Sequence, residues 1–321
     1  MKNKIIIGTR GSKLALWQAE WVKEELKKIH PGLDVDLIII KTTGDKVLDV
    51  PLAQVGGKGL FVKEIEEAML RGEAHIAVHS MKDVPTEFPE GLHLSVICKR
   101  EDPRDVFIAP LREGKPVVSS FRELPHGAKI GTSSLRRATQ LKSIRPDLVV
   151  EQLRGNVETR IRKMDSGMFD AVILAAAGVK RLGMQERITE ILPLDISLSA
   201  IGQGAVGIEC RTDDTETIAM LAPLNHHETS LCVRAERALL KRLDGGCQVP
   251  IAAHAEWDNG IIRLDGLVGS IDGATIVRSA ASGTDADPES LGTSLAETLL
   301  AMGADEILAE VYGKIPPKGT I

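Results

Sequence analysis

The sequence predicts an α/β protein of two similar units followed by a smaller α+β unit. Short β-branched runs alternate with helical segments through the first two thirds of the 321 residues. The alternation starts again after a polar, proline-containing segment at 101–105. The last hundred residues instead contain three successive strand-like runs. Alternation is typical of a sheet covered by helices, whereas successive strands favour an antiparallel sheet.

The first unit is predicted over residues 1–100. Its expected elements are a strand over 4–8, a helix over 12–29, a strand over 35–41, a glycine-rich stretch over 42–59, a helix over 60–71 and a strand over 75–79. Ser12 is placed to cap the first helix, and His30-Pro31-Gly32 ends it.

The second unit repeats this order over residues 105–195. Its expected elements are a strand over 129–131, a helix from Ser133 or Ser134 to Lys142, a strand over 148–153, a helix from Asn156 to Met164 and a strand over 170–175. The segment 195–204 is predicted to cross back to the first unit. Two crossings leave a cleft between the units, which is where such folds bind ligands.

The third unit is predicted over the last hundred residues. Its expected elements are a helix over 226–242, strands over 251–257, 261–268 and 275–281, and a helix over 288–309. This order favours a small antiparallel sheet packed against helices.

Composition excludes several classes of protein. The chain has 40 Lys+Arg against 45 Asp+Glu, 43% apolar residues and only 3% aromatic residues. These values are typical of a globular protein and argue against base stacking on single-stranded nucleic acid. Residues 130–187 nevertheless hold eight Arg and three Lys against six acidic residues. This basic segment indicates a local anion site or, alternatively, a solvated helical face.

The cysteines and the N-terminal residues indicate the cellular compartment to expect. The four cysteines are irregularly spaced and form no Cys-x-x-Cys pair, which is typical of free thiols inside the cell. The apolar run at 5–7 is too short for a signal peptide, and the longest apolar stretch, 171–179, is far below the roughly 18 residues of a membrane span. We therefore expect a cytoplasmic protein with no membrane segment.

Two familiar patterns are weak here. The glycines of 202–207 match a dinucleotide fingerprint, but strand-like residues follow instead of a helix. We interpret them as sites of close backbone approach, and a nicotinamide or flavin oxidoreductase stays a minor alternative. His75 and His79 share one face of a predicted strand without a third ligand, which favours core or sheet-end histidines over a metal site.

The strongest anion signal is Gly131-Thr132-Ser133-Ser134-Leu135-Arg136-Arg137. Hydroxyls and free N–H groups at a helix start, with two arginines in the first turn, attract carboxylates. Cations there oppose the helix dipole, so we expect a carboxylate ligand to offset that cost. Further arginines follow strand ends and suggest a ligand with several carboxylates. They are Arg10, Arg154, Arg160, Arg162 and Arg181.

Two further segments carry reactive groups. Lys82 and Asp83 follow a predicted strand, where they form either a cleft-edge pair or an ordinary surface turn. Cys247 lies in the glycine turn 245–247, where a thiol is more reactive than in a core. Cys98, Cys210 and Cys232 lie in apolar or helical surroundings, so we interpret them as packing residues.

In combination, these segments closely resemble the porphobilinogen deaminase family, and they occur in the family's order across nearly the whole chain. The matching segments are Gly8-Thr9-Arg10-Gly11-Ser12 with Leu14, Ala15 and Gln18, then 57–61, 79–85, 100–105, 131–137, 154–157, 202–205 and 245–247. Each is modest alone, and together they are specific.

The resemblance implies two periplasmic-binding-protein-like α/β domains with a cleft and a small C-terminal α+β domain. The implied boundaries are 1–101 with 200–222, then 102–199, then 223–321. It also implies a transferase that joins four porphobilinogen molecules head to tail, with loss of ammonia, into hydroxymethylbilane in porphyrin and haem biosynthesis. A dipyrromethane cofactor is implied on Cys247 through a thioether. We expect a monomer with no metal, nucleotide, nucleic acid or membrane partner.

The resemblance also assigns roles to residues. Asp83 is the implied catalytic carboxylate, near the pyrrole nitrogens. The implied cofactor contacts are Lys82, Asp83, Thr132, Ser133, Ser134, Arg136, Arg137, Gly155, Asn156 and Gln203. The implied substrate contacts are Arg10, Ser12, Arg154, Arg160 and Arg181. The segment 56–59 is a candidate lid. A non-enzymatic, two-lobed carboxylate-binding protein is the main alternative, and it would carry no covalent adduct.

Overall fold

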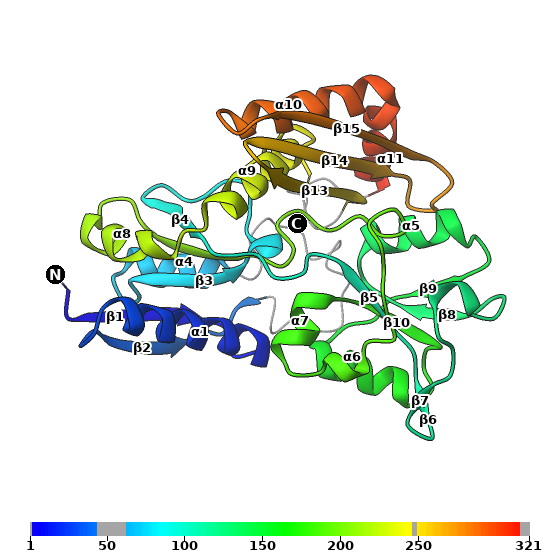
Figure 1. Ribbon diagram of the computed structural model, residues 1–321, viewed down its shortest axis with the longest axis horizontal. Helices are drawn as coiled ribbons and strands as arrows, with labels where there is room; N and C mark the ends of the chain where they lie inside the picture. Colours follow the sequence, from blue (N-terminus) through cyan, green and yellow to red (C-terminus); the bar gives the residue numbers. More distant parts are fainter. Residues whose placement is uncertain (1, 44–61, 246–248, 315–321) are drawn as a thin grey trace.

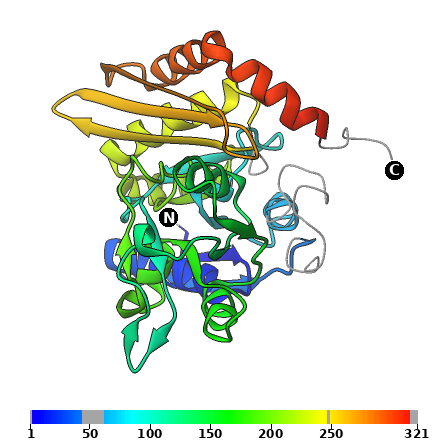
Figure 2. The ribbon, with the colours of Figure 1, turned by 90° about the vertical axis from the view of Figure 1, so that its right-hand side faces the viewer.

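The computed structural model describes residues 2–43, 62–245 and 249–314. Two α/β lobes lie side by side, and a third unit lies against both of them (Figure 1, Figure 2). Each contains its own buried apolar cluster, as expected for separate packing units. The mixed α/β class and the small antiparallel unit predicted from the sequence are confirmed.

The first lobe is built on a five-stranded sheet of order β2-β1-β3-β12-β4. Its strands are β1 (Lys4–Thr9), β2 (Asp34–Ile39), β3 (Ile76–Ser80), β4 (Leu92–Ile97) and β12 (Val206–Arg211). Its helices are α1 (Lys13–Ile29), α4 (Lys63–Leu70) and α8 (Thr215–Leu221). β1 pairs in parallel with β2 and β3, whereas β12 runs antiparallel to β3 and β4. A strand from beyond residue 200 therefore completes the first sheet.

The second lobe has a sheet of order β11-β5-β10-β8-β9. Its strands are β5 (Asp105–Ile108), β8 (Lys129–Gly131), β9 (Val149–Glu151), β10 (Ala171–Ala175) and β11 (Glu190–Ile191), with a small hairpin of β6 (Leu111–Arg112) and β7 (Lys115–Pro116). Its helices are α5 (Leu135–Ile144), α6 (Val157–Asp165) and α7 (Ala176–Arg181). β8 is parallel to β9 and β10, so their carboxyl ends share one edge.

The third unit packs helices on an antiparallel sheet of order β13-β14-β15. Its elements are α9 (His227–Arg242), β13 (Ile251–Asp258), β14 (Ile261–Gly269), β15 (Ile276–Thr284), α10 (Pro288–Leu299), η5 (Leu300–Ala304) and α11 (Asp305–Lys314). α9 and α10 approach closely at Gly292, where an added Cβ would lie 2.1 Å from the Ala235 carbonyl oxygen. No helix in the described ranges is both long and apolar enough to cross a bilayer.

Polar contacts attach the third unit to the first lobe. Arg100 forms a two-pronged ion pair with buried Glu236 of α9, at 2.6 and 3.2 Å. The same carboxylate accepts from the backbone N–H groups of Gly202 and Ala255. Because the Glu236 carboxylate accepts four hydrogen bonds, the cost of burying its charge is offset. These bonds hold the third unit against the first lobe.

Most predicted elements are confirmed within a few residues. Ser12 caps α1, accepting from the Ala15 N–H at 3.3 Å, and Asn156 caps α6, accepting from the Thr159 N–H at 2.9 Å. The first two residues of the helix expected over 60–71 lie outside the described ranges. Two connections, 98–104 and 192–205, join the lobes, as the sequence predicted.

The differences have physical causes. β5 begins at Asp105, inside the segment interpreted as a polar break, because its strand residues are all buried. The strand expected over 170–175 ends where β10 ends, but the sequence did not predict α7, because its alanines continue the apolar pattern of the strand. The single helix expected over 288–309 is interrupted at Gly303, whose φ of 100° is left-handed.

Candidate functional site

The predicted site residues follow the carboxyl ends of strands in both lobes. In the first lobe, Arg10 and Ser12 follow β1, while Lys82 and Asp83 lie in the short helix η1 (Met81–Asp83) after β3. In the second lobe, 132–134 follow β8 and 154–156 follow β9. Carboxyl ends of parallel strands meet at one sheet edge, so each lobe presents its set together.

A small pocket of about 70 Å³ joins the residues of the first lobe. Arg10, Ser12, Gln18, Ser80 and Asp83 are among the residues that line it. The Gln18 amide donates to the Ser80 hydroxyl at 2.8 Å, which fixes the wall next to Asp83. The structure therefore brings the candidate catalytic carboxylate together with two candidate substrate contacts.

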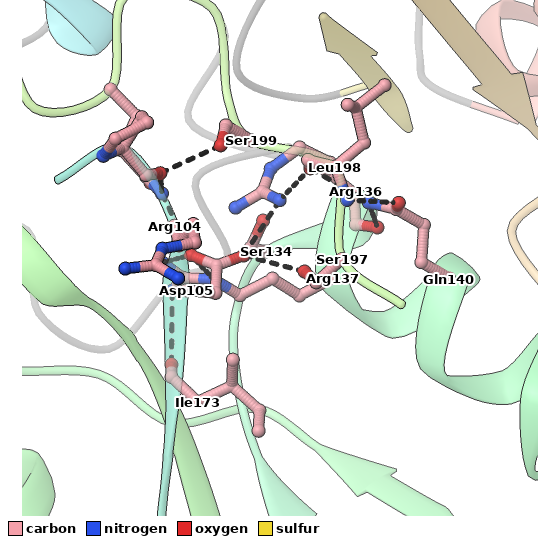
Figure 3. A network of polar contacts seen from close by, with 12 residues as sticks. Arg104, Asp105, Ser134, Arg136, Arg137, Gln140, Ile173, Ser197, Leu198 and Ser199 are labelled. Atoms are coloured by element: carbon pink, nitrogen blue, oxygen red, sulfur yellow. Dashed lines mark hydrogen bonds and ion pairs between the residues drawn. The ribbon is translucent and has the colours of Figure 1, made fainter. Parts of the chain in front are cut away.

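A buried charge network lies at the matching edge of the second lobe (Figure 3). The Asp105 carboxylate lies 2.8 Å from Arg136 and 2.7 Å from Arg137, and none of its surface is exposed. It also accepts from the Ser197 hydroxyl at 2.7 Å and the Gln203 amide at 3.0 Å. We call Asp105, Arg136, Arg137, Ser197 and Gln203 the Asp105 network.

From the sequence, we expect a ligand carboxylate to offset the two arginines at the start of α5. Asp105, a residue of the chain itself, supplies part of that negative charge. Burial by itself raises the pKa of Asp105, but Arg136 and Arg137 outweigh it and hold the pKa far below the usual range. The guanidiniums also donate to backbone carbonyls, Arg136 to Leu198 at 2.5 Å and Arg137 to Ile173 at 3.1 Å. One internal carboxylate thus offsets part of the cost of two cations at the start of α5.

Sequence reasoning did not assign Asp105 a role. Its position carried a signal, because a lone acidic residue directly precedes the apolar run 106–109, whose side chains are all buried. A carboxylate at the start of a fully buried strand needs cationic or hydrogen-bonding partners. Such a position points to a partner elsewhere in the chain, although it does not say which one.

A second charged group, which we call the Lys82 group, spans the two lobes and comprises Lys82, Asp83, Arg154 and Arg160. Burial lowers the pKa of Lys82 to about 8, with Asp83 opposing the shift and Arg137 adding to it. Burial likewise lowers the pKa of Arg160 to about 10, together with Arg137 and Arg154, against Asp83. These mutual effects place η1 of the first lobe close to α5 and α6 of the second.

The two groups together carry an excess of positive charge. These residues include the five cations Lys82, Arg136, Arg137, Arg154 and Arg160 and the two carboxylates Asp83 and Asp105. Burial is the main cause of the lowered pKa values of Lys82 and Arg160, and the neighbouring arginines add to it. A ligand with several carboxylates would relieve the excess of positive charge.

Polar residues around the cations are largely held by local bonds. Ser133 donates to the Leu153 carbonyl at 2.7 Å, and the Thr132 hydroxyl accepts from the Ser134 N–H at 3.2 Å. Gly155 adopts a φ of 117°, and an added Cβ would lie 2.7 Å from Thr159. A glycine at 155 therefore allows the tight turn that starts α6.

Gln203 presents a different case. Its side-chain nitrogen donates to the Pro103 carbonyl at 2.6 Å and to Asp105. Its side-chain oxygen is buried and accepts no hydrogen bond within the described ranges. A buried acceptor without a donor is costly, and an N–H donor on a ligand would satisfy it.

Arg181 lies apart from the Lys82 group. Its guanidinium donates to the Gly204 carbonyl at 2.7 Å and lies 5.5 Å from the centre of the Trp17 ring. Burial lowers its pKa, and Glu101 opposes the shift. The described contacts therefore place Arg181 at the junction between α1, α7 and the crossing segment.

The cysteines divide as predicted where they are described. Cys98, Cys210 and Cys232 are buried free thiols, and burial raises the pKa of Cys98 and Cys232 to about 12. They are packing residues with low reactivity. Cys247 and the candidate lid at 56–59 lie outside the described residues.

The interpretation of the glycines as sites of close backbone approach is confirmed. Gly204 has a φ of 93°, and an added Cβ would lie 2.3 Å from the Glu101 carbonyl oxygen, so backbone passes close there. Strand β12 follows instead of a helix. Buried His79 lies 3.0 Å from Glu209, and His75 accepts from the Ile6 N–H. In the described part of the chain, no group of three or more His, Cys, Asp or Glu residues is placed to hold a metal.

Comparisons with known proteins cover nearly the whole chain. The family model "Porphobilinogen deaminase, dipyromethane cofactor binding domain" matches residues 5–219, and "Porphobilinogen deaminase, C-terminal domain" matches residues 230–301. Porphobilinogen deaminase of Geobacter sulfurreducens is 62% identical over 97% of this chain and 95% of its own length. That of Trichlorobacter lovleyi is 60% identical over 96% of this chain and 97% of its own length.

Similarity to solved structures is more distant. The methionine-binding protein MetQ aligns over 69% of this chain and 89% of its own, with 14% identity and a TM-score of 0.44. The assignment therefore depends on the family models and the curated relatives. On that basis, this chain belongs to the porphobilinogen deaminase family.

Proposed function

We propose that this chain is a transferase that joins four porphobilinogen molecules head to tail, with loss of ammonia, into the linear tetrapyrrole hydroxymethylbilane. The observation that carries the proposal is the excess of cations between the lobes, of which Arg136 and Arg137 are buried. Each pyrrole of the substrate bears an acetate and a propionate, so the growing chain is a polyanion. Arginine and lysine at strand ends are suited to such a ligand.

The residues present fit a dipyrromethane cofactor. Its carboxylates match the excess cations, and its pyrrole N–H groups match the buried acceptor of Gln203. The residues that would hold it are Lys82, Thr132, Ser133, Ser134, Arg136, Arg137, Gly155, Asn156 and Gln203, with Cys247 attaching it through a thioether. When bound, it supplies the pyrrole on which the chain is built.

Asp83 is the proposed catalytic carboxylate. Departure of ammonia from the substrate leaves an electron-poor pyrrole, and a fixed negative charge stabilises the positive charge that develops. Asp83 lines the pocket that Arg10 and Ser12 share, so a substrate carboxylate held by these two would lie next to it. The Asp83 oxygens are also placed to hold or pass on a proton at the ring.

The remaining substrate contacts come from both lobes. Arg10 and Ser12 belong to the first lobe, whereas Arg154 and Arg160 belong to the second. Arg181 is proposed as a substrate contact on the family resemblance alone. Since the two lobes contribute opposite walls, substrate binding would favour their closure.

The domain boundaries are proposed as 1–101 with 200–222, then 102–199, then 223–321. The pairing of β12 with β3 and β4 supports the discontinuous first domain. We also propose a cytoplasmic monomer without nucleic-acid, membrane or metal partners, in porphyrin and haem biosynthesis. The curated relatives favour the enzyme over a non-catalytic carboxylate-binding protein.

Intact-mass measurement tests the proposal. The purified chain should exceed its sequence mass by two porphobilinogen units less two ammonias. Cys247→Ser should remove both the excess and the activity, because the thiols that the structure describes, Cys98, Cys210 and Cys232, are all buried. Cys232→Ser is the matched control, a buried thiol whose replacement should keep both. An active protein without added mass would overturn the proposal.

A further inference from the structure

Arg237 connects the third unit to the turn that carries Asp83. It lies on α9, and its guanidinium donates to the Val84 carbonyl at 3.1 Å and to the Pro85 carbonyl at 2.6 Å. These two carbonyls directly follow Asp83 in the chain. The side chain also lies 5.8 Å from the centre of the Phe88 ring. Three contacts from one guanidinium thus fix the exit of the turn.

Arg237 has no acidic partner among the residues that the structure describes. Burial alone lowers its pKa to about 10, and no carboxylate lies within ion-pair distance among the described residues. Its neighbours on α9 differ, since Arg234 pairs with Glu289 at 2.6 Å and Arg242 pairs with Glu297 at 2.5 Å. A partly buried guanidinium without an acidic partner is costly for stability. Its hydrogen bonds to the Val84 and Pro85 carbonyls therefore need an explanation other than a contribution to stability.

The turn itself has few bonds of its own. η1 spans only three residues and is closed by the Val84 N–H, which donates to the Met81 carbonyl at 3.2 Å. Met81 and Val84 are buried in a small apolar cluster with Val233 of α9. Asp83 lies between these two anchors. A single short turn has weak internal cooperativity, so its geometry depends on outside contacts.

We propose that Arg237 is a positioning residue that holds the Asp83 carboxylate in its catalytic geometry from the third unit. This inference deepens the proposed function and rests on it. A displacement of a reacting group by about 1 Å can cost on the order of 100-fold in rate. Loss of two charge-assisted bonds at the end of the turn would allow a shift of that kind. Substrate affinity would change little, because Arg237 lies outside the substrate-binding residues.

Variants at Arg237 separate this role from a purely structural one. Arg237 borders an open groove of about 540 Å³, so a shorter side chain there leaves no closed cavity. Arg237→Gln should keep the cofactor mass, lower kcat about tenfold and change KM less than twofold. Arg237→Lys should recover most of the rate, since the ammonium still donates to a carbonyl. Arg234→Gln, three residues earlier on α9, is the matched control and should leave kcat unchanged.

The readouts distinguish the possible failures. If Arg237→Gln carries the cofactor and turns over within twofold of wild type, the proposal is wrong. It is also wrong if kcat, cofactor content and unfolding temperature fall together and Arg237→Lys recovers none of them, since that pattern is structural. The proposed function fails separately, if the wild-type chain lacks the cofactor mass and the activity.

Discussion

The Asp105 network and the Lys82 group are close in space and opposite in construction. In the first, one carboxylate takes four side-chain donors and is fully buried. In the second, burial disfavours the charged forms of Lys82 and Arg160, other cations lie near them, and Asp83 opposes the shift at both. Both hold charges whose pKa values are strongly shifted.

The contrast shows what a shifted pKa indicates. The pKa of Asp105 is lowered because the fold satisfies its charged form, which is typical of a structural ion-pair network. The pKa of Lys82 is lowered because burial disfavours its charged form more than the neighbouring carboxylates favour it, which is typical of a candidate ligand site. The two regions differ in whether the shift favours the charged form, as for Asp105, or disfavours it, as for Lys82. The size of the shift does not distinguish them.

Removing the Asp105 carboxylate should have the largest effect on stability. Asp105→Ala leaves two buried guanidiniums without a counter-charge, and breaking a buried pair in this way costs about 3–5 kcal/mol. Chemical denaturation of the purified variant would measure the loss. Asp213→Asn, at a side chain that is 82% exposed beside Arg211, should change the free energy of unfolding by less than about 0.5 kcal/mol. A loss at Asp105 no larger than this would contradict a structural role.

Asp83→Ala should give the reverse pattern. The cofactor mass should remain and the free energy of unfolding should change by less than about 1 kcal/mol, because ligand carboxylates in the cofactor-bearing protein also balance the cations next to Asp83. Turnover should fall by about 100-fold or more, the usual effect of removing a group that stabilises charge or transfers protons. Steady-state kinetics on a variant of verified mass would measure it. Normal turnover would remove Asp83 from the mechanism.

The sequence predicted local features well, because their signals are local. Ser12 and Asn156 cap the helices that their positions indicated. Strand–helix alternation predicted both lobes, and the arginines at strand ends marked the anion-binding edge. Gly204 was correctly interpreted as a point of close backbone approach. Each of these conclusions depends on residues within one turn or one strand end.

The sequence did not predict contacts between residues that are distant along the chain. Asp105 is 31 residues from Arg136 and meets it because β5 pairs with β10, which also pairs with β8, the strand that precedes α5. Arg237 is more than 150 residues from Val84, and nothing local marks it apart from Arg234. Whether a charge has an opposite charge beside it depends on burial and on contacts between distant parts of the chain. The sequence therefore predicted where the cations lie, and the fold shows which of them have carboxylate partners.

Lys82 offers the finest test of the contrast, through the pH dependence of stability. Burial lowers its pKa from 10.5 to about 8 in the folded protein. Below pH 8 the side chain is protonated in both the folded and unfolded states, so folding bears the full cost of burying the charge. Between pH 8 and 10.5 the folded protein has released the proton while the unfolded chain keeps it, so stability rises with pH.

The prediction compares Cys247→Ser, which should lack the cofactor, with the double variant that adds Lys82→Met. At pH 7 the double variant should be more stable by roughly 2 kcal/mol, after allowance for partial exposure of Lys82. The difference should shrink as pH rises through 8 and vanish near 10.5, which urea unfolding at several pH values would measure. In the cofactor-bearing protein the same substitution should give no gain, because ligand carboxylates then balance the ammonium. A stabilisation that is independent of pH would mean that Lys82 is only a poorly packed side chain, and that the Lys82 group is not awaiting an anion.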